Sequence, residues 1–241
     1  MATVKQHYDN VLSDVYSWMF GGFENGIQRN IEFVKKHKLT PQGSRIAIDL
    51  GAGCGFQTIP LARSGYTVTA IDFDAKLLSE LQRNSDGLEI TTIQGDLIDF
   101  DKSLNANAEL IVCMTDTILH LESREKVALL FAKVCAALEA GGKFIITFRD
   151  LNYELKDADR ILPVRSDENT IFTCFLEYDS ETVKVHDIVY QKSDGVWNLS
   201  KSFYSKLRLS EAWVSEQLSQ SGFSKTTSTV ENSVITIIAS V

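Results

Sequence analysis

The stretch Ile46-Ala47-Ile48-Asp49-Leu50-Gly51-Ala52-Gly53-Cys54-Gly55 begins as an apolar strand and ends in three glycines at alternate positions. Glycine has no Cβ, so its backbone adopts positive φ at little cost and lets a ligand approach closely. A carboxylate, Asp49, stands two residues before the first glycine. The pattern predicts a strand followed by a loop that binds a small molecule over the strand end. Asp49 either holds this loop or orients a ligand's ammonium group through water.

The spacing of the glycines distinguishes two kinds of cofactor. A dinucleotide-binding G-x-G-x-x-G motif that starts at Gly51 requires glycine where this chain has Phe56. The run Asp-x-Gly-x-Gly-x-Gly instead resembles the first motif of the class I S-adenosylmethionine-dependent methyltransferases. The resemblance implies S-adenosyl-L-methionine as the cofactor and S-adenosyl-L-homocysteine as the product.

Two further predicted strands end in residues that suit an adenosine. Strand 66–71 is followed by Asp72, which can accept hydrogen bonds from both ribose hydroxyls, and by Phe73, whose ring can cover the adenine. Strand 88–93 is followed by Asp96, which in the family lies beside the adenine amino group. An Asp after a strand is also a common helix cap or turn former. The shared position of these residues at one sheet edge favours ligand binding.

Strands and helical segments alternate along the chain, which is typical of a doubly wound α/β sheet. We predict a Rossmann-like, mostly parallel sheet, and the resemblance implies seven strands. After the fifth strand, three segments within 168–209 are rich in β-branched and aromatic residues. They predict a three-stranded antiparallel insertion. In its last strand, 196–209, odd positions are mostly apolar and even positions mostly polar, so one face packs and the other meets water or a ligand.

No linker or repeat divides the sequence, and we predict a single domain over residues 1–241. Within it we expect an amino-terminal helical lid at 1–40 and a cofactor-binding core at 41–150. The antiparallel flap follows at 168–209, and a closing helix and strands occupy 210–241.

The expected lid carries aromatic residues that either cover the cofactor or pack the lid on the domain. Tyr8 and Tyr16 keep hydroxyl groups, and the pattern around them resembles the capping region of small-molecule methyltransferases. Trp18 suits simple packing equally well. The expected cofactor-binding residues are Tyr8, Trp18, Asp49, Gly51, Gly53, Gly55, Asp72, Phe73, Asp96, Leu97, Met114 and Thr115.

The flap and the lid together resemble the glycine and sarcosine N-methyltransferase branch of the family. In that branch an Arg near the end of strand five grips a substrate carboxylate, which implies this role for Arg149; an ion pair with Asp150 or Asp116 is the alternative. His120 matches a family position near the cofactor or acceptor, or it caps a turn. Asp116 or His120 could act as the base that takes the proton of the methyl acceptor. The expected catalytic residues are Asp116, His120, Tyr16 and Arg149.

Composition narrows the function further. A net charge of −8 over 241 residues disfavours nucleic acid as a substrate, because such binding depends on Lys and Arg. The four cysteines are scattered and predict neither a metal site nor disulfides. Without a signal segment or a membrane span, we expect a cytoplasmic monomer or homodimer that methylates a small molecule. The alternatives are a nicotinamide-dependent reductase and a non-catalytic S-adenosylmethionine-binding protein.

Overall fold

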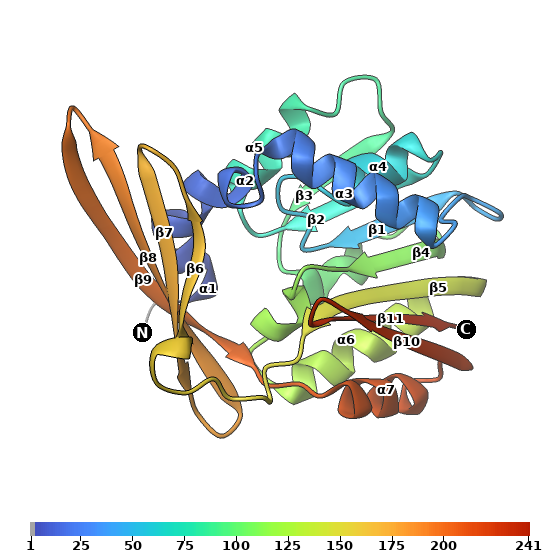
Figure 1. Cartoon of the computed structure of the whole chain (residues 1–241). Coiled ribbons are helices and arrows are strands. Elements are labelled where there is room, and N and C mark those ends of the chain that lie inside the picture. The colour runs from blue at the N-terminus through green and yellow to red at the C-terminus, as the bar shows by residue number, and fades with distance from the viewer. Residues whose placement is uncertain (1–2) are drawn as a thin grey trace.

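A seven-stranded sheet forms the core of the computed structural model, which describes residues 3–241 (Figure 1). Met1 and Ala2, the first residues of the expected lid, lie outside the described residues. The strand order is β10-β11-β5-β4-β1-β2-β3, and β11 alone is antiparallel to both of its neighbours. This confirms the predicted, mostly parallel sheet. The strands are β1 (Ile46–Leu50), β2 (Thr67–Asp72), β3 (Ile90–Gln94), β4 (Ala108–Cys113), β5 (Leu138–Arg149), β10 (Lys225–Glu231) and β11 (Val234–Ser240).

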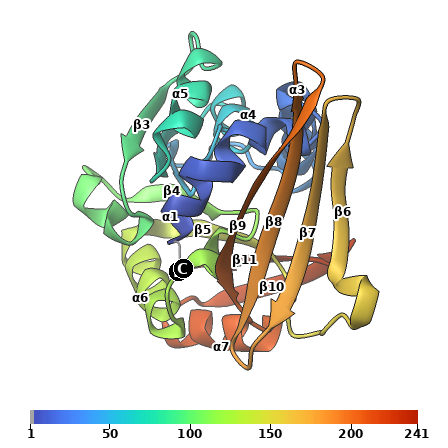
Figure 2. The same cartoon turned by 90° about the vertical axis from the view of Figure 1, so that its left-hand side faces the viewer.

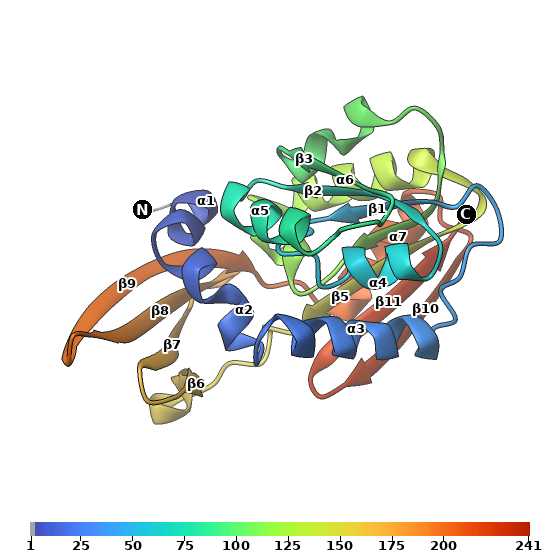
Figure 3. The ribbon, with the colours of Figure 1, turned by 90° about the horizontal axis from the view of Figure 1, so that it is seen from above.

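Helices cover both faces of this sheet (Figures 1 and 3). On one face lie α3 (Phe23–Lys36), α4 (Thr58–Arg63) and α5 (Ala75–Arg83), and on the other lie α6 (Arg124–Ala137) and α7 (Glu211–Gln220). Because strands buried on both faces cannot alternate polar and apolar residues, β1 and β4 are almost wholly apolar. Three of these helices begin after a residue whose side chain accepts a hydrogen bond from a backbone N–H of the first turn. These residues are Asp74 at α5, Ser123 at α6 and Ser210 at α7.

The winding direction of the chain reverses at the centre of the sheet. Strand β1 pairs with β2 on one side and with β4 on the other, all in parallel. In open α/β sheets the crevice at such a reversal, outside the carboxyl ends of the strands, is where ligands bind. Short 3₁₀ helices follow these ends at Leu97–Ser103 and Thr117–His120.

The insertion is a separate antiparallel sheet with four strands, so the predicted three-stranded flap is wrong by one strand (Figure 2). The additional strand is β6, which follows a 3₁₀ turn (Asp157–Arg160). It contains Pro163, and its pairing with β7 shifts register between Pro163 and Arg165. An edge strand interrupted by proline lacks the alternating pattern that identifies a strand in sequence. The flap strands are β6 (Ile161–Ser166), β7 (Thr170–Tyr178), β8 (Thr182–Ser193) and β9 (Val196–Leu207).

The predicted faces of the last flap strand hold only in part. Trp197 and Leu199, on the apolar face of β9, are 42% and 47% exposed, because nothing in the described chain covers the outer side of the flap tip. On the opposite face Tyr204 and Lys206 are buried where β9 approaches the core. Both faces of β9 are therefore buried at this end, since Leu207 of the apolar face is 6% exposed and packs in the core.

The amino-terminal lid lies between the flap and the core (Figure 3). It is not one regular helix but a chain of short turns: α1 (Val4–His7), a π turn (Tyr8–Leu12), a 3₁₀ turn (Ser13–Val15) and α2 (Tyr16–Met19). Its apolar side chains pack against Phe172 and Val189 on the inner face of the flap.

No helix within residues 3–241 combines the length and the apolar character needed to cross a bilayer.

Candidate active site

The three glycines after β1 serve different purposes. All have positive φ, of 77° at Gly51, 53° at Gly53 and 93° at Gly55. A Cβ on Gly51 would lie 2.4 Å from Thr117 Cγ2, and one on Gly55 would lie 2.3 Å from Leu81 Cδ1, so both positions also need glycine for packing. At Gly53 the nearest atom to a Cβ would be 3.7 Å away. A Cβ at Gly53 would therefore make ordinary van der Waals contacts, and it is the positive φ that favours glycine where the loop meets a cavity.

A first cavity of about 730 Å³ lies over the carboxyl ends of the central strands. Four of the expected cofactor-binding residues lie outside its wall: Asp49 and Gly55 are buried behind the loop, Met114 packs in the core, and Trp18 contacts the flap. The expected residues that line it are Tyr8, Tyr16, Gly51, Gly53, Asp72, Phe73, Asp96, Leu97, Thr115 and His120.

Asp72 ties the end of β2 to the glycine loop at the floor of this cavity. Its Oδ2 accepts from the Gly53 N–H at 2.8 Å, and its Oδ1 accepts from the Asp74 N–H at 2.8 Å. Burial raises the pKa of the Asp72 carboxyl to about 6, although these backbone N–H groups oppose the shift. A carboxylate has about four acceptor positions, so two remain for a ligand's hydroxyl groups.

A second cavity of about 1050 Å³ lies between the inner face of the flap and the carboxyl ends of β4 and β5. The two cavities adjoin each other, because five residues line both. These shared residues come from the lid, the end of β4 and the flap: Tyr8, Tyr16, Thr115, His120 and Lys206. We call this boundary the junction.

Asp116 stands beside the junction and is held by two cations. Its Oδ1 accepts from the Arg149 backbone N–H at 2.9 Å, and its Oδ2 accepts from Arg149 Nε at 2.8 Å and from Lys206 Nζ at 2.7 Å. Burial alone would raise the pKa of Asp116, but Lys206 and Arg149 outweigh burial and hold that pKa well below its usual range. The residue is therefore a fixed anion. Of the two roles expected for Arg149, the ion pair with Asp116 is present.

Residues 47–142 match a family model described as a methyltransferase domain. This segment contains the glycine loop, Asp72, Asp96 and the end of β4, which are the parts that build the first cavity. This part of the chain is therefore similar to the methyltransferase domains of that family. The cofactor of this family is S-adenosyl-L-methionine.

Comparison with individual proteins agrees with this family. Over 126 residues the chain is 25% identical to glycine/sarcosine N-methyltransferase of Parasynechococcus marenigrum (strain WH8102), and the match covers 52% of this chain but only 42% of that protein. The fold is similar to the CcbJ methyltransferase from Streptomyces caelestis (TM-score 0.79, 16% identity, 96% of each chain). It is also similar to S-adenosylmethionine-bound CalS10, an amino pentose methyltransferase from Micromonospora echinaspora (TM-score 0.76, 11% identity, 94% and 95% of the chains).

His120 keeps a neutral ring at the junction. Burial, and then the nearby Lys206, lower the pKa of His120 to about 3. The ring stacks on Tyr204 with centroids 5.2 Å apart, and its Nδ1 has no hydrogen-bond partner within residues 3–241. A neutral imidazole with a free polar atom can hydrogen-bond to a ligand, but it is a weak proton acceptor.

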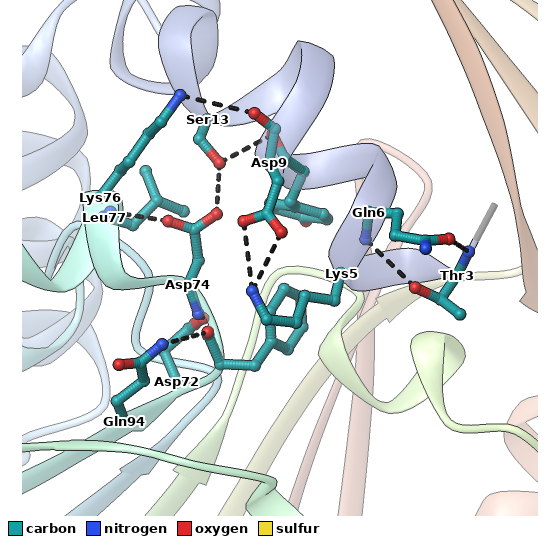
Figure 4. Close-up of polar contacts among 12 residues, drawn as sticks. Thr3, Lys5, Gln6, Asp9, Ser13, Asp72, Asp74, Lys76, Leu77 and Gln94 are labelled. Atoms are coloured by element: carbon teal, nitrogen blue, oxygen red, sulfur yellow. Dashed lines mark hydrogen bonds and ion pairs between the residues drawn. The ribbon is translucent and has the colours of Figure 1, made fainter.

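The lid is fastened to the core next to the first cavity. Figure 4 shows the Ser13 hydroxyl donating to the Asp74 carboxylate and the Lys76 ammonium donating to the Asp9 carbonyl at 3.4 Å. The Tyr8 ring meets Phe73 edge to face at 5.4 Å. These contacts hold an aromatic side chain of the lid over the end of β2.

A second set of bonds fastens the lid to the flap. His7 Nε2 and Asp187 Oδ2 are 2.8 Å apart and fully buried, and Trp18 Nε1 donates to Asp167 Oδ2 at 2.6 Å. Trp18 therefore joins the lid to the flap. Because the lid bonds to both sides, it bridges the core and the flap.

Asp49 holds the glycine loop from behind. The Thr58 hydroxyl of α4 donates to Asp49 Oδ2 at 2.6 Å, and the carboxyl group is 1% exposed. Burial raises the pKa of Asp49 to about 7, although the bond from Thr58 opposes the shift. The position fits the structural role that the sequence allowed.

We expect Asp49→Asn to flatten the pH dependence of stability. A pKa raised from 3.8 to about 7 means that the contribution of Asp49 is fully present below about pH 4 and is lost as pH rises to 7. Relative to wild type, the variant should therefore gain about 4 kcal/mol in free energy of unfolding between pH 4 and pH 8. Urea unfolding at both pH values measures this, with the exposed Asp86→Asn as control. A constant difference between Asp49→Asn and wild type would contradict the assignment.

Several residues around the cavities were not expected from the sequence. Gln94 lines the first cavity and donates to the Phe73 carbonyl at 3.2 Å. Lys206 and Tyr204 belong to the flap. In the sequence, only their place on the even-numbered, mostly polar face of β9 indicated that they could meet a ligand. His7 and Asp187 carried no local motif, since 180 positions separate them.

Proposed function

We propose that this methyltransferase transfers the methyl group of S-adenosyl-L-methionine to a small-molecule acceptor in the second cavity. The junction carries the proposal: residues of the lid, the core and the flap line both cavities there. A donor in one cavity and an acceptor in the other would meet at these side chains. Holding two reactants in this way can supply a large part of a rate enhancement.

The residues of the first cavity suit the parts of the cofactor. Asp72 would accept the ribose hydroxyls, Phe73 and Tyr8 would contact the adenine, and Asp96 would lie near its amino group. Gly51 and Gly53 of the loop line the same cavity, so the ligand would also contact the loop backbone. When bound, S-adenosyl-L-methionine supplies a methyl group on a sulfonium, which leaves as a thioether.

At the junction the protein mainly positions the acceptor. His120 would hydrogen-bond to its N–H or O–H, and Tyr16 would contact it from the lid. Asp116 is unsuited to take a proton, because Arg149 and Lys206 hold it as an anion. The acceptor proton would therefore leave to water that enters with the acceptor.

Two observations favour a small molecule over a nucleic acid. The chain carries a net charge of −8, whereas nucleic-acid binding requires a basic surface. The similar proteins are named for small molecules, glycine and sarcosine in one case and an amino pentose in another.

We expect His120→Ala to lower kcat/KM by about 10–100-fold, the effect of losing one buried hydrogen bond to the acceptor. Because the pKa of His120 is about 3, its charge does not change between pH 5 and 8. The pH profile of kcat/KM should therefore keep its shape in the variant. An inflection near pH 6.5 that His120→Ala abolishes would instead make His120 a proton acceptor. His37→Ala, outside both cavities, is the control.

Transfer of label from S-adenosyl-L-methionine with a tritiated methyl group tests the proposal. The protein is incubated with pooled small amines, phenols and carboxylic acids, and separately with protein and nucleic acid. We expect label in the small-molecule fraction. Label in nucleic acid or protein would contradict the proposed acceptor class. Cofactor binding with no transfer to any pool would favour the non-catalytic alternative.

A further inference from the structure

The second cavity is too large for an acceptor the size of an amino acid. Its volume of about 1050 Å³ exceeds that of the first cavity, about 730 Å³. An acceptor the size of glycine would fill only about 150 Å³, at ~30 Å³ for each water-sized atom. Pockets of about 300–1000 Å³ enclose most of a drug-sized ligand. The volume therefore favours a much bulkier acceptor.

Away from the junction, the wall of the second cavity is mostly apolar. Alternate residues of an antiparallel strand point to the same face, and the inner faces of β6, β7 and β8 contribute Leu162, Phe172, Leu176 and Val185. Leu12 and Met19 of the lid add to this wall. These six residues, which we call the apolar wall, have no polar side-chain atoms and favour an acceptor with an apolar body.

The polar end of the second cavity presents hydrogen-bond donors. Arg149 uses Nε and Nη2 for Asp116, which leaves Nη1, and its side chain is 56% exposed. Lys206 is buried beside it. These two cations share the bound carboxylate of Asp116, so their remaining N–H groups are available as donors to a ligand. Three other carboxylates line the cavity: the exposed Asp150, the half-buried Glu211, and the buried Asp187, which is bonded to His7 and Cys174.

We propose that the acceptor is a bulky molecule with an apolar body, which lies against the apolar wall, and a neutral or anionic head that accepts hydrogen bonds from Arg149 and Lys206. This rests on the proposed function, because it assigns the second cavity to the acceptor. The apolar wall is then the main determinant of specificity. An amino acid or a free sugar would leave most of this wall without contacts.

Straight-chain carboxylates from butanoate to decanoate serve as probes, titrated calorimetrically into the protein with and without S-adenosyl-L-homocysteine. We expect affinity to rise by about fourfold for each methylene, the effect of burying it. Decylamine should bind at least tenfold more weakly than decanoate. An affinity independent of chain length, or equal binding of the amine, would overturn the proposal.

A matched pair of variants on β6 locates the binding. Leu162 belongs to the apolar wall, whereas its neighbour Ile161 is 54% exposed on the outer face. We expect Leu162→Glu to weaken decanoate binding at least tenfold and Ile161→Glu to leave it unchanged. Equal losses in both variants would overturn the proposal. Should Leu162→Glu fail to fold, the chain-length series in the wild-type protein still decides.

The same titrations separate this proposal from the proposed function. S-adenosyl-L-homocysteine that fails to bind would overturn the proposed function, whatever the carboxylates do. A flat chain-length series in protein that binds S-adenosyl-L-homocysteine would overturn the bulky apolar acceptor alone.

Discussion

Replacing Asp116 by alanine is expected to destabilise the protein by about 3 kcal/mol or more, because two cations lose their shared carboxylate. The unpaired Lys206 should account for most of this loss in stability, because its side chain is only 7% exposed. The side chain of Arg149 is 56% exposed and can be hydrated instead. Burial already lowers the pKa of Lys206 even with Asp116 present. Thermal or urea unfolding measures the loss.

The pH dependence of this variant gives a second check. Without Asp116 the folded-state pKa of Lys206 should fall further below its unfolded value. A depressed lysine pKa contributes stability that is present at high pH and is lost as pH falls through the folded pKa. The loss in free energy of unfolding of Asp116→Ala relative to wild type should therefore be smaller at pH 9 than at pH 6.

Two controls distinguish the ion cluster from a general effect of mutation. Asp150→Ala removes an exposed carboxylate whose side chain bonds to Asn152, and it should cost less than about 0.5 kcal/mol. Adding Lys206→Met to Asp116→Ala should recover most of the lost stability, because the buried unpaired charge is gone. A double variant no more stable than Asp116→Ala would contradict the account.

Replacing Asp72 by alanine is expected to weaken the binding of S-adenosyl-L-homocysteine by about 100-fold or more. Two hydrogen bonds to a charged group would be lost, worth about 3 kcal/mol together. The Gly53 N–H, which bonds to Asp72 Oδ2 at 2.8 Å, would also lose its partner, so the glycine loop would be less well held. Calorimetric titration measures the affinity.

The control for Asp72 is Asp86→Ala, an exposed carboxylate in the turn before β3. This variant should bind S-adenosyl-L-homocysteine as the wild type does. An affinity of Asp72→Ala within threefold of wild type would contradict the assignment of Asp72 to the ribose.

The central sheet could be predicted because its signals are local. The apolar strand that ends at Leu50 is followed directly by glycine, and the next strand ends at Asp72, so the residues that mark each strand end lie within or next to the strand. The topology then brings these strand ends to one edge, as parallel strands must. That is why most of the expected cofactor residues line one cavity.

Contacts between distant segments could not be predicted in the same way. Lys206 meets Asp116 across 90 positions, and neither residue has a motif that names the other. Met114 lies at the end of β4 like the cavity residues, yet it packs among core residues such as Val34. Which face of a strand end meets a cavity depends on the helix behind it, and a single sequence does not record this.

The flap shows a further limit of pattern reasoning. Alternation in β9 identified two faces, but not that the apolar face would be buried only at Leu207, near the core, or that the polar face would be buried there as well. Burial is decided by the lid and the core, which reach Tyr204 and Lys206 but leave Trp197 half exposed. The proposed acceptor site depends on this arrangement.

The most direct test of the central claim is a calorimetric titration of the wild-type protein with S-adenosyl-L-homocysteine, and in parallel with NADPH. The account predicts binding of one S-adenosyl-L-homocysteine per chain, its loss in Asp72→Ala, and no binding of NADPH. Binding of NADPH with no response to S-adenosyl-L-homocysteine would contradict it and favour the nicotinamide-dependent reductase.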